Sequence, residues 1–270
     1  MTSSSPRRTV LVTGASAGIG LAFARVFAEH GFDLVLTARR EKRLRSVADE
    51  LAARHQVAAR IVADDLEDPA APARIVERLA AEDVTIDALV NNAGYGLPGK
   101  YAETEWDAQS RFIQIMVTAY AELTHRLLPG MVERQYGRIV NVASVAGLVP
   151  GTPGHTLYAA SKAFLIKFSQ SLALETRRHG VHVTALCPGF TYTEFHDANG
   201  TREMVSKHVP RSMWLDADVV ARQGFEGVMA GRLQVVPGFG YKALVALTRL
   251  LPESLVMKAT LRQSRRFRAQ

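Results

Sequence analysis

The chain has 270 residues, of which 47% are apolar and 22% charged, a balance that excludes disordered, collagen-like and disulfide-scaffold proteins. Its formal net charge is +7, and this excess equals the basic residues of two acid-free segments, 1–8 and 254–270, namely Arg7, Arg8, Lys258, Arg262, Arg265, Arg266 and Arg268. The intervening body is charge-balanced, which argues against a nucleic-acid-binding fold with a basic face.

Short apolar runs alternate with segments of helical periodicity. The runs contain mostly Val, Leu and Ile without strict alternation, as is typical of strands buried on both faces. Strands are predicted at Thr9–Thr13, Asp33–Thr37, Val57–Val62, Ala88–Asn91, Arg138–Ala143, Val181–Cys187 and Leu233–Val236. Helices are predicted at about residues 18–30, 41–54, 69–81, 105–134, 157–178 and 216–230. This order predicts one α/β domain over residues 1–270, a Rossmann-type doubly wound parallel sheet of about seven strands with helices on both faces.

A glycine-rich turn, Gly14 to Gly20, joins the first predicted strand to the first predicted helix. Its spacing is Gly-x-x-x-Gly-x-Gly. Glycines permit a tight turn and a close approach of the backbone to a pyrophosphate at the start of the helix. A purely structural turn is the alternative interpretation, but the position directly after the first strand favours dinucleotide binding.

The second predicted strand is followed by two arginines, in the run Thr37-Ala38-Arg39-Arg40. An acidic residue here would accept the ribose 2′-hydroxyl of NAD, whereas a guanidinium pairs with the 2′-phosphate of NADP. A solvated basic pair at the start of a helix is the alternative. Together with the glycine turn, Arg39 predicts that NADP(H) is preferred over NAD(H).

A serine, a tyrosine and a lysine form the candidate reaction centre. Ser144 follows the fifth predicted strand, and Tyr158 and Lys162 lie four residues apart, on one face of a helix. A nearby ammonium group lowers the pKa of a phenol, which makes proton exchange with a carbonyl or alcohol oxygen feasible. A serine hydroxyl can hold the same oxygen. An ordinary surface Tyr–Lys pair is the alternative.

The order and spacing of five motifs resemble the classical short-chain dehydrogenase/reductase family. The motifs are the glycine turn, Asn91-Asn92-Ala93-Gly94, Ser144, Tyr158 with Lys162, and Pro188-Gly189, over roughly residues 9–236. The resemblance implies hydride transfer between a nicotinamide and a carbonyl or alcohol carbon, with Ser144, Tyr158 and Lys162 catalytic and Tyr158 moving the proton. It implies a homodimer or homotetramer, formed through the helices at 105–134 and 157–178.

The resemblance also implies a set of cofactor-binding residues. In the family, Asp65 would meet the adenine, Lys162 the nicotinamide ribose and Thr193 the carboxamide. The full set is Gly14, Ser16, Gly18, Ile19, Gly20, Arg39, Asp65, Leu66, Asn92, Ala93, Gly94, Tyr158, Lys162, Pro188, Gly189, Thr191 and Thr193.

Two features depart from the family pattern. The interval from Ser144 to Tyr158 is one residue longer than usual, which changes a loop at the substrate entrance. Met116 stands where the family usually has an asparagine that holds a proton-relaying water, and a thioether is a very weak acceptor. We expect a slower or differently routed proton relay without loss of hydride transfer. A non-catalytic or weakly active dinucleotide-binding sensor or scaffold protein is the alternative function.

An aromatic segment at about residues 190–214 is predicted to be a substrate lid. Phe190, Tyr192 and Phe195 lie in it. His155, three residues before Tyr158, is expected to reach the substrate or to be a solvated loop side chain. Leu148 and Val149 extend the apolar wall, which favours a ketone, steroid-like, acyl or quinone-like substrate over a polyol. The histidines show no metal-ligand spacing, so no metal site is predicted.

A basic, leucine-rich extension occupies about residues 238–270. Such a segment can lie on an anionic membrane. Because Pro252 interrupts its amphipathic pattern, a helix that closes the substrate pocket or packs on a partner subunit is the favoured interpretation.

A reducing compartment suits the single cysteine. Cys187 has no cysteine to pair with in the chain and is expected to be a small buried hydrophobe. The apolar run at Thr9–Thr13 is too short for the core of a signal peptide, and no run approaches the ~18 apolar residues of a membrane span. A cytoplasmic protein is expected.

Overall fold

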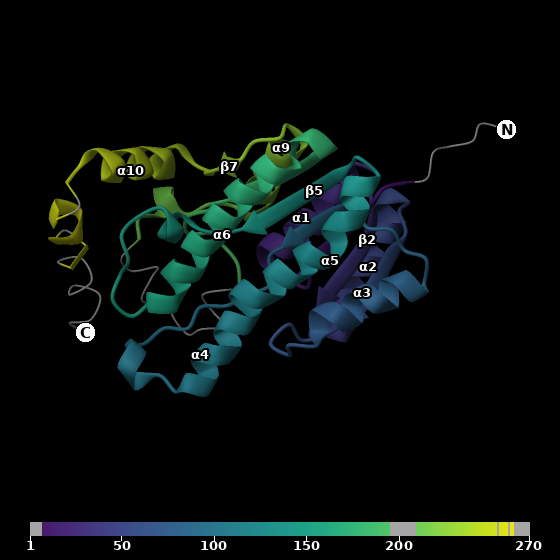
Figure 1. The fold of residues 1–270 in the computed structure, drawn as a ribbon, viewed down its shortest axis with the longest axis horizontal. Helices are drawn as coiled ribbons and strands as arrows, with labels where there is room; N and C mark the ends of the chain where they lie inside the picture. Colours follow the sequence, from purple (N-terminus) through teal and green to yellow (C-terminus); the bar gives the residue numbers. More distant parts are fainter. Residues whose placement is uncertain (1–6, 195–208, 253, 259, 262–270) are drawn as a thin grey trace.

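Seven parallel strands form one sheet in the order β3-β2-β1-β4-β5-β6-β7 (Figure 1). The computed structural model describes residues 7–194, 209–252, 254–258 and 260–261. The strands are β1 (Thr9–Thr13), β2 (Asp33–Ala38), β3 (Ala59–Ala63), β4 (Ala88–Asn91), β5 (Gly137–Val142), β6 (Val181–Leu186) and β7 (Gln234–Val235). The predicted Rossmann-type parallel sheet is confirmed.

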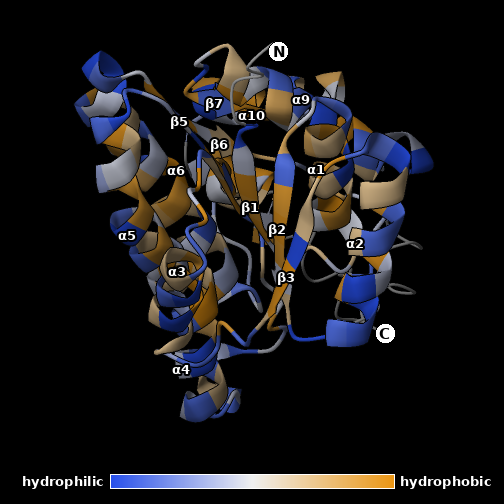
Figure 2. Cartoon of the chain, turned by 90° about the vertical axis from the view of Figure 1, so that its right-hand side faces the viewer, coloured by the Kyte–Doolittle hydropathy of each residue, from blue (hydrophilic) through white to orange (hydrophobic). Residues whose placement is uncertain are grey.

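Helices cover both faces of the sheet (Figure 2). They are α1 (Gly18–Glu29), α2 (Glu41–His55), α3 (Ala71–Ala81), α4 (Trp106–Ile113), α5 (Ala119–Glu133), α6 (Thr156–Thr176), α9 (Ala217–Met229) and α10 (Phe239–Leu250). On one face α1, α2 and α9 enclose a core that includes Phe23, Phe27 and Phe225. On the other face α3 to α6 enclose Phe112 and Leu123. Burial from both sides explains why the strand sequences are continuously apolar.

The sheet changes its winding direction at β1 and β4. Val10 of β1 pairs with Leu34 of β2 on one side and with Ala88 of β4 on the other. The loops that leave the carboxyl ends of β1 and β4 therefore run to opposite faces of the sheet and leave a crevice between them. This crevice receives the glycine turn and the segment that begins at Asn92.

The predicted helix over residues 105–134 is confirmed as a continuous helical stretch from Trp106 to Glu133, but it is not a regular α-helix throughout. A π-helical turn, Gln114–Thr118, separates α4 from α5, and the Ala119 amide donates to the Gln114 carbonyl five residues earlier. Such turns insert one extra residue and occur frequently at functional sites. Met116 lies inside this turn and is buried. The apolar spacing on either side fits an ordinary helix, so periodicity does not reveal the insertion.

Helix α10 lies at one edge of the molecule (Figure 1). It ends before Pro252, and residues 254–258 form a further helical stretch. Within the described ranges, no helix is long and apolar enough to cross a membrane.

Candidate active site

The glycine turn between β1 and α1 is closed so tightly that side chains do not fit. Gly14 has a φ of +66°, and a Cβ there would lie 2.9 Å from the Ala93 Cα. A Cβ on Gly20 would lie 2.3 Å from the Gly14 carbonyl oxygen. Helix α1 begins at Gly18 without a side-chain cap, so its first backbone amides are available to an anionic group. The turn therefore fits the pyrophosphate of a dinucleotide.

Thr13 joins the glycine turn to the segment after β4. Its Oγ1 accepts hydrogen bonds from the Asn92 amide at 2.8 Å and the Ala93 amide at 2.9 Å, and donates to the Val90 carbonyl at 3.2 Å. The Asn92 side-chain amide donates to the Thr13 carbonyl at 2.9 Å. These bonds hold Asn92 and Ala93 at the mouth of the crevice.

The two arginines after β2 point to different partners. Arg40 Nη2 donates to Ser16 Oγ in the glycine turn at 3.1 Å. Arg39 Nη1 lies 3.3 Å from Glu67 Oε1 and 3.8 Å from Asp65 Oδ2, after β3. The structure therefore brings Arg40, which the sequence argument did not select, onto the glycine turn, where its Nη1 also pairs with Glu194 Oε2 at 3.0 Å. It places Arg39 beside Asp65. Leu66 is buried under the same loop.

Ser144, Tyr158 and Lys162 lie at the carboxyl end of the sheet. Ser144 caps a short 3₁₀ turn after β5, where its Oγ accepts from the Ala146 amide at 3.1 Å and donates to the Pro188 carbonyl at 3.4 Å. A hydrogen bond also links Ser144 to Tyr158. Lys162 Nζ donates to the Val142 carbonyl at 2.7 Å and lies 5.7 Å from the centre of the Tyr158 ring. The fold thus brings together the three residues that the spacing selected.

Burial dominates the proton affinities at this centre. It raises the pKa of Tyr158, an effect that the hydrogen bond with Ser144 partly opposes. It lowers the pKa of Lys162 to about 7. The net shift of the Tyr158 pKa is opposite to the lowering expected from the Tyr-x-x-x-Lys spacing, because desolvation of the phenol outweighs the lysine.

Met116 packs against the backbone of Gly94. A Cβ on Gly94 would lie 2.4 Å from the Met116 Sδ, so the methionine side chain occupies the space that a side chain at position 94 would need. Next to it, the buried Tyr120 hydroxyl donates to the Ala93 carbonyl at 2.8 Å, and the centre of its ring lies 5.9 Å from Lys162 Nζ. The place of the usual asparagine is thus filled by an apolar contact.

The segment after β6 crosses from the reaction centre to α1. The Thr191 hydroxyl donates to the Gly189 carbonyl at 3.0 Å. Thr193 lies beside Gly18, where a glycine Cβ would meet the threonine Cβ at 3.0 Å. Ile19, in the first turn of α1, packs against the core. This segment closes the remaining side of the crevice.

An apolar cluster begins at the residue after Ser144. Phe190 packs in a cluster around Val145 and Tyr241, which also includes Leu148, Val149, Val245, Met213, Leu215 and Val236. The His155 ring lies edge-on to Tyr158, with 6.5 Å between centres. Tyr192 is half exposed and stacks on Trp214 at 4.8 Å. Phe195 lies outside the described residues.

Sequence reasoning missed the residues that arrive from distant segments. Tyr241 of α10 accepts a hydrogen bond from the Phe190 amide at 2.9 Å and donates to the Met213 carbonyl at 2.6 Å. Leu215 pairs with the backbone around Thr191. Beneath the site, the buried Asn91 and Asn141 share a hydrogen bond of 2.8 Å. The consecutive Asn91 and Asn92 stand out in the sequence and could have indicated this hydrogen-bond network. Nothing in the sequence marks Tyr241.

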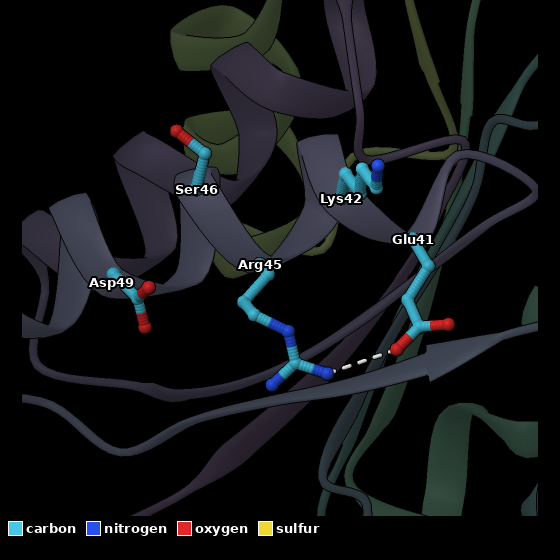
Figure 3. Close-up of a pocket in the computed structure, with 5 residues that line it drawn as sticks. All are labelled: Glu41, Lys42, Arg45, Ser46 and Asp49. Carbon is cyan, nitrogen blue, oxygen red and sulfur yellow. Dashed lines mark hydrogen bonds and ion pairs between the residues drawn. The ribbon is translucent and has the colours of Figure 1, made fainter.

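We assign no chemical role to two other features, although Cys187 lies close enough to Lys162 to act on its pKa. Cys187 is buried, and burial raises the pKa of its thiol to about 12, as expected for a packed side chain without nucleophilic character. A shallow hollow on α2, bordered by the Glu41–Arg45 ion pair, is a solvated helix face (Figure 3).

Comparisons with known proteins agree with this geometry. The family model for short chain dehydrogenase matches residues 8–203. The sulfoacetaldehyde reductase of Chromohalobacter salexigens is 35% identical over 243 residues, which cover 84% of this chain and 93% of the relative. A short-chain dehydrogenase from Sphingobium yanoikuyae, solved in complex with NADPH, is 34% identical with a TM-score of 0.79, covering 90% of this chain and 94% of that one. The bulky-bulky ketone specific alcohol dehydrogenase from Comamonas testosteroni is 28% identical with a TM-score of 0.75, covering 92% of this chain and 96% of that one.

The fold and the site define a dinucleotide-dependent oxidoreductase. The chain belongs to the short-chain dehydrogenase/reductase family, whose members act on alcohol and carbonyl groups.

Proposed function

We propose that this chain is an NADP(H)-dependent carbonyl reductase that acts on apolar ketones or aldehydes, with Tyr158 as the proton donor. The observation that carries the proposal is the convergence of Ser144, Tyr158 and Lys162 at the same sheet edge as the glycine turn. Because the carboxyl ends of parallel strands meet at this edge, a cofactor on the turn and a substrate at Tyr158 lie within one crevice.

The residues around the crevice fit NADP(H). The glycine turn would hold the pyrophosphate, Arg40 with Ser16 and Arg39 would hold the 2′-phosphate, and Asp65 and Leu66 would border the adenine. Asn92, Ala93 and Gly94 line the other wall, and Pro188, Gly189, Thr191 and Thr193 close the nicotinamide end. When bound, NADPH supplies the hydride that the reduction requires.

The protein supplies the proton and holds the reacting oxygen. The Tyr158 hydroxyl donates its proton to the carbonyl oxygen, and its raised pKa keeps it protonated at neutral pH. The Ser144 hydroxyl donates a hydrogen bond to the same oxygen and stabilises the charge that develops on it. The ammonium group of Lys162 donates a hydrogen bond to the Val142 carbonyl, and burial lowers its pKa to about 7. In its protonated form Lys162 favours the tyrosinate that remains after Tyr158 has donated its proton. In alcohol oxidation the same proton moves in the opposite direction.

The wall of the substrate side favours an apolar compound. Val145, Phe190 and Tyr241 pack there in a cluster of apolar side chains. The specificity in the name of the Comamonas testosteroni enzyme supports a bulky ketone, whereas sulfoacetaldehyde, named for the Chromohalobacter salexigens relative, is small and anionic. We favour the bulky ketone because the cluster around Phe190 is apolar.

We also infer a homodimer or homotetramer that uses α4, α5 and α6. Trp106 on α4 and Leu174 on α6 are each 64% exposed, which suits a contact between subunits. Light scattering coupled to size exclusion measures the mass, and Leu174→Glu should lower it. A monomeric wild-type chain would contradict this inference.

A purely dinucleotide-binding role is a second candidate, favoured by Met116 in the proton-relay position. The two functions separate in one assay that follows NADPH oxidation with a panel of apolar ketones, beside a titration of NADPH binding. Turnover with ketones supports the reductase. Tight NADPH binding without turnover on any carbonyl compound would support the sensor.

A further inference from the structure

Helix α10 turns an apolar face outward. Phe239 is 86% exposed, Leu250 82% and Leu247 53%. Single exposed leucines are ordinary, but large apolar side chains gathered on one face mark an interaction surface. The predicted role of this helix as a cover for the substrate pocket accounts only for Tyr241 and Val245, which face inward.

The exposed residues share one side of the helix. At 3.6 residues per turn, Phe239, Leu244, Leu247, Leu250 and Leu251 fall within roughly 140° of the circumference. Tyr241 and Val245 lie on another side, where they pack against Val145. An amphipathic helix that only covers a core would place its leucines inward. Here the core contact and the apolar surface are two separate faces of α10.

Beyond α10 the chain turns back onto the protein. Met257 and Leu261 line a hollow together with Thr156 and Ala163 of α6, so they do not extend the exposed side of α10. We call the exposed apolar residues of α10, Phe239, Leu244, Leu247 and Leu250, together with Leu251 the outer apolar face.

Positive charge accompanies the outer apolar face. Lys242, Arg249 and Lys258 are all exposed. Among the described residues between 239 and 261 these three are the charged side chains, and none is acidic. A partner for this surface must therefore offer apolar depth and negative charge together.

We propose that the outer apolar face is a docking surface for an anionic lipid bilayer. A helix with leucine and phenylalanine on one side and basic residues beside them lies in the membrane interface, where the apolar side chains enter the acyl boundary and the cations meet lipid headgroups. A symmetric contact with a second copy would repeat Lys242 and Arg249 on both sides, and like charges in one interface are unfavourable. A single helix at the edge of the molecule also presents a convex surface, which suits a bilayer (Figure 1).

Hydrogen bonds connect the inward side of α10 to the segments that form the proposed substrate wall. Tyr241, on the inward face of α10, hydrogen-bonds to the backbone of both Phe190 and Met213. The outer apolar face thus lies on another side of the same helix from the cluster around Val145, the residue that follows Ser144. The inference itself does not depend on the proposed reaction, because lipid binding is measured without turnover.

The test is flotation of the full-length protein with phosphatidylcholine vesicles that contain or lack phosphatidylglycerol. We expect binding to the anionic vesicles that weakens as salt is added, because salt screens the cations. Leu247→Ser and Leu250→Ser should each weaken binding roughly tenfold, as expected for one leucine side chain removed from lipid. Lys242→Gln with Arg249→Gln should weaken it by about fivefold per cation on anionic vesicles only.

A matched control separates docking from general damage. Leu233 is 45% exposed on the turn before β7, away from α10, and Leu233→Ser should leave vesicle binding unchanged. Thermal melting and NADPH binding verify that each variant is folded. Wild-type protein that stays unbound on anionic vesicles would overturn the proposal. Full vesicle binding by Leu247→Ser would also overturn it. If wild type does not bind vesicles and Leu247→Ser lowers the mass of an oligomer, the outer apolar face is instead a contact with a second copy of the chain.

Discussion

Arg40 donates to the Ser16 hydroxyl at 3.1 Å, so a guanidinium from the end of β2 lies on the turn between β1 and α1. Arg39, one residue earlier, turns instead to Glu67 and Asp65. The two neighbouring arginines therefore lie on two sides of the proposed 2′-phosphate position, with Arg40 closer to the glycine turn.

This geometry predicts that Arg40→Ala weakens NADPH binding more than Arg39→Ala does. Loss of one charge-assisted hydrogen bond costs about 1.5–3 kcal/mol, so the NADPH dissociation constant should rise by more than tenfold for Arg40→Ala. NADH lacks the 2′-phosphate and should bind both variants as it binds wild type. Titrations that follow nicotinamide fluorescence measure all six affinities, those of wild type and both variants for each cofactor. Equal or tighter binding of NADH than NADPH by wild type would contradict the assignment.

Lys162 predicts a specific dependence of stability on pH. Its pKa in the folded protein is lowered from 10.5 to about 7 by burial, so between these values the unfolded chain binds the proton and the folded chain does not. The free energy of unfolding then rises with pH across this window. Below a pH of about 7, where both states bind the proton, the cost of burying the charged lysine is fully present. The melting temperature of wild type relative to Lys162→Met should therefore increase from neutral to alkaline pH. A difference that stays constant or falls would contradict the burial of an uncharged lysine.

Met116→Asn tests the altered proton relay. An amide at this position can bind the water that the thioether cannot, so we expect a higher kcat and a shifted pH profile. The buried amide should lower stability by about 1–3 kcal/mol if it lacks a partner. Met116→Leu is the control, since it keeps an apolar side chain against Gly94. Unchanged rate and pH profile in Met116→Asn would show that proton transfer does not pass through this position.

Much of the fold was predictable because the strands are buried on both faces. Their Val- and Leu-rich runs, such as Thr9–Thr13 and Ala88–Asn91, match the observed bounds. The π-helical turn at Gln114–Thr118 was not predictable, because one inserted residue leaves the apolar pattern intact. The strand predicted at Val57–Val62 begins at Ala59 instead, since terminal residues of a strand carry little periodic signal.

The candidate site was predictable where its residues come from one motif. Tyr158 and Lys162 share a helix, so their spacing alone places them together. The choice between Arg39 and Arg40 depends on how the backbone turns after β2, which composition does not encode. Tyr241 reaches Phe190 from a distant helix, and only the packing of α10 reveals that contact.

Tyr241→Phe should weaken the packing of the proposed substrate wall. The variant loses the hydrogen bonds to the Phe190 amide and the Met213 carbonyl, and we expect it to be less stable by about 1–3 kcal/mol. KM for a bulky ketone should rise more than kcat falls, because the variant moves the wall and not the proton donor. Denaturant unfolding and steady-state kinetics measure the two effects.

Gly189→Ala is a second test, since its Cβ would lie 1.9 Å from the Tyr241 ring. A fully stable Gly189→Ala protein would contradict this packing.

The most direct test of the account is turnover by Tyr158→Phe, measured as ketone-dependent NADPH oxidation beside an NADPH binding titration on the same sample. The variant removes only the phenolic hydroxyl, so binding should stay within about twofold of wild type while turnover falls by at least a hundredfold. Oxidation of NADPH at the wild-type rate by Tyr158→Phe would show that another group donates the proton and would contradict the central claim.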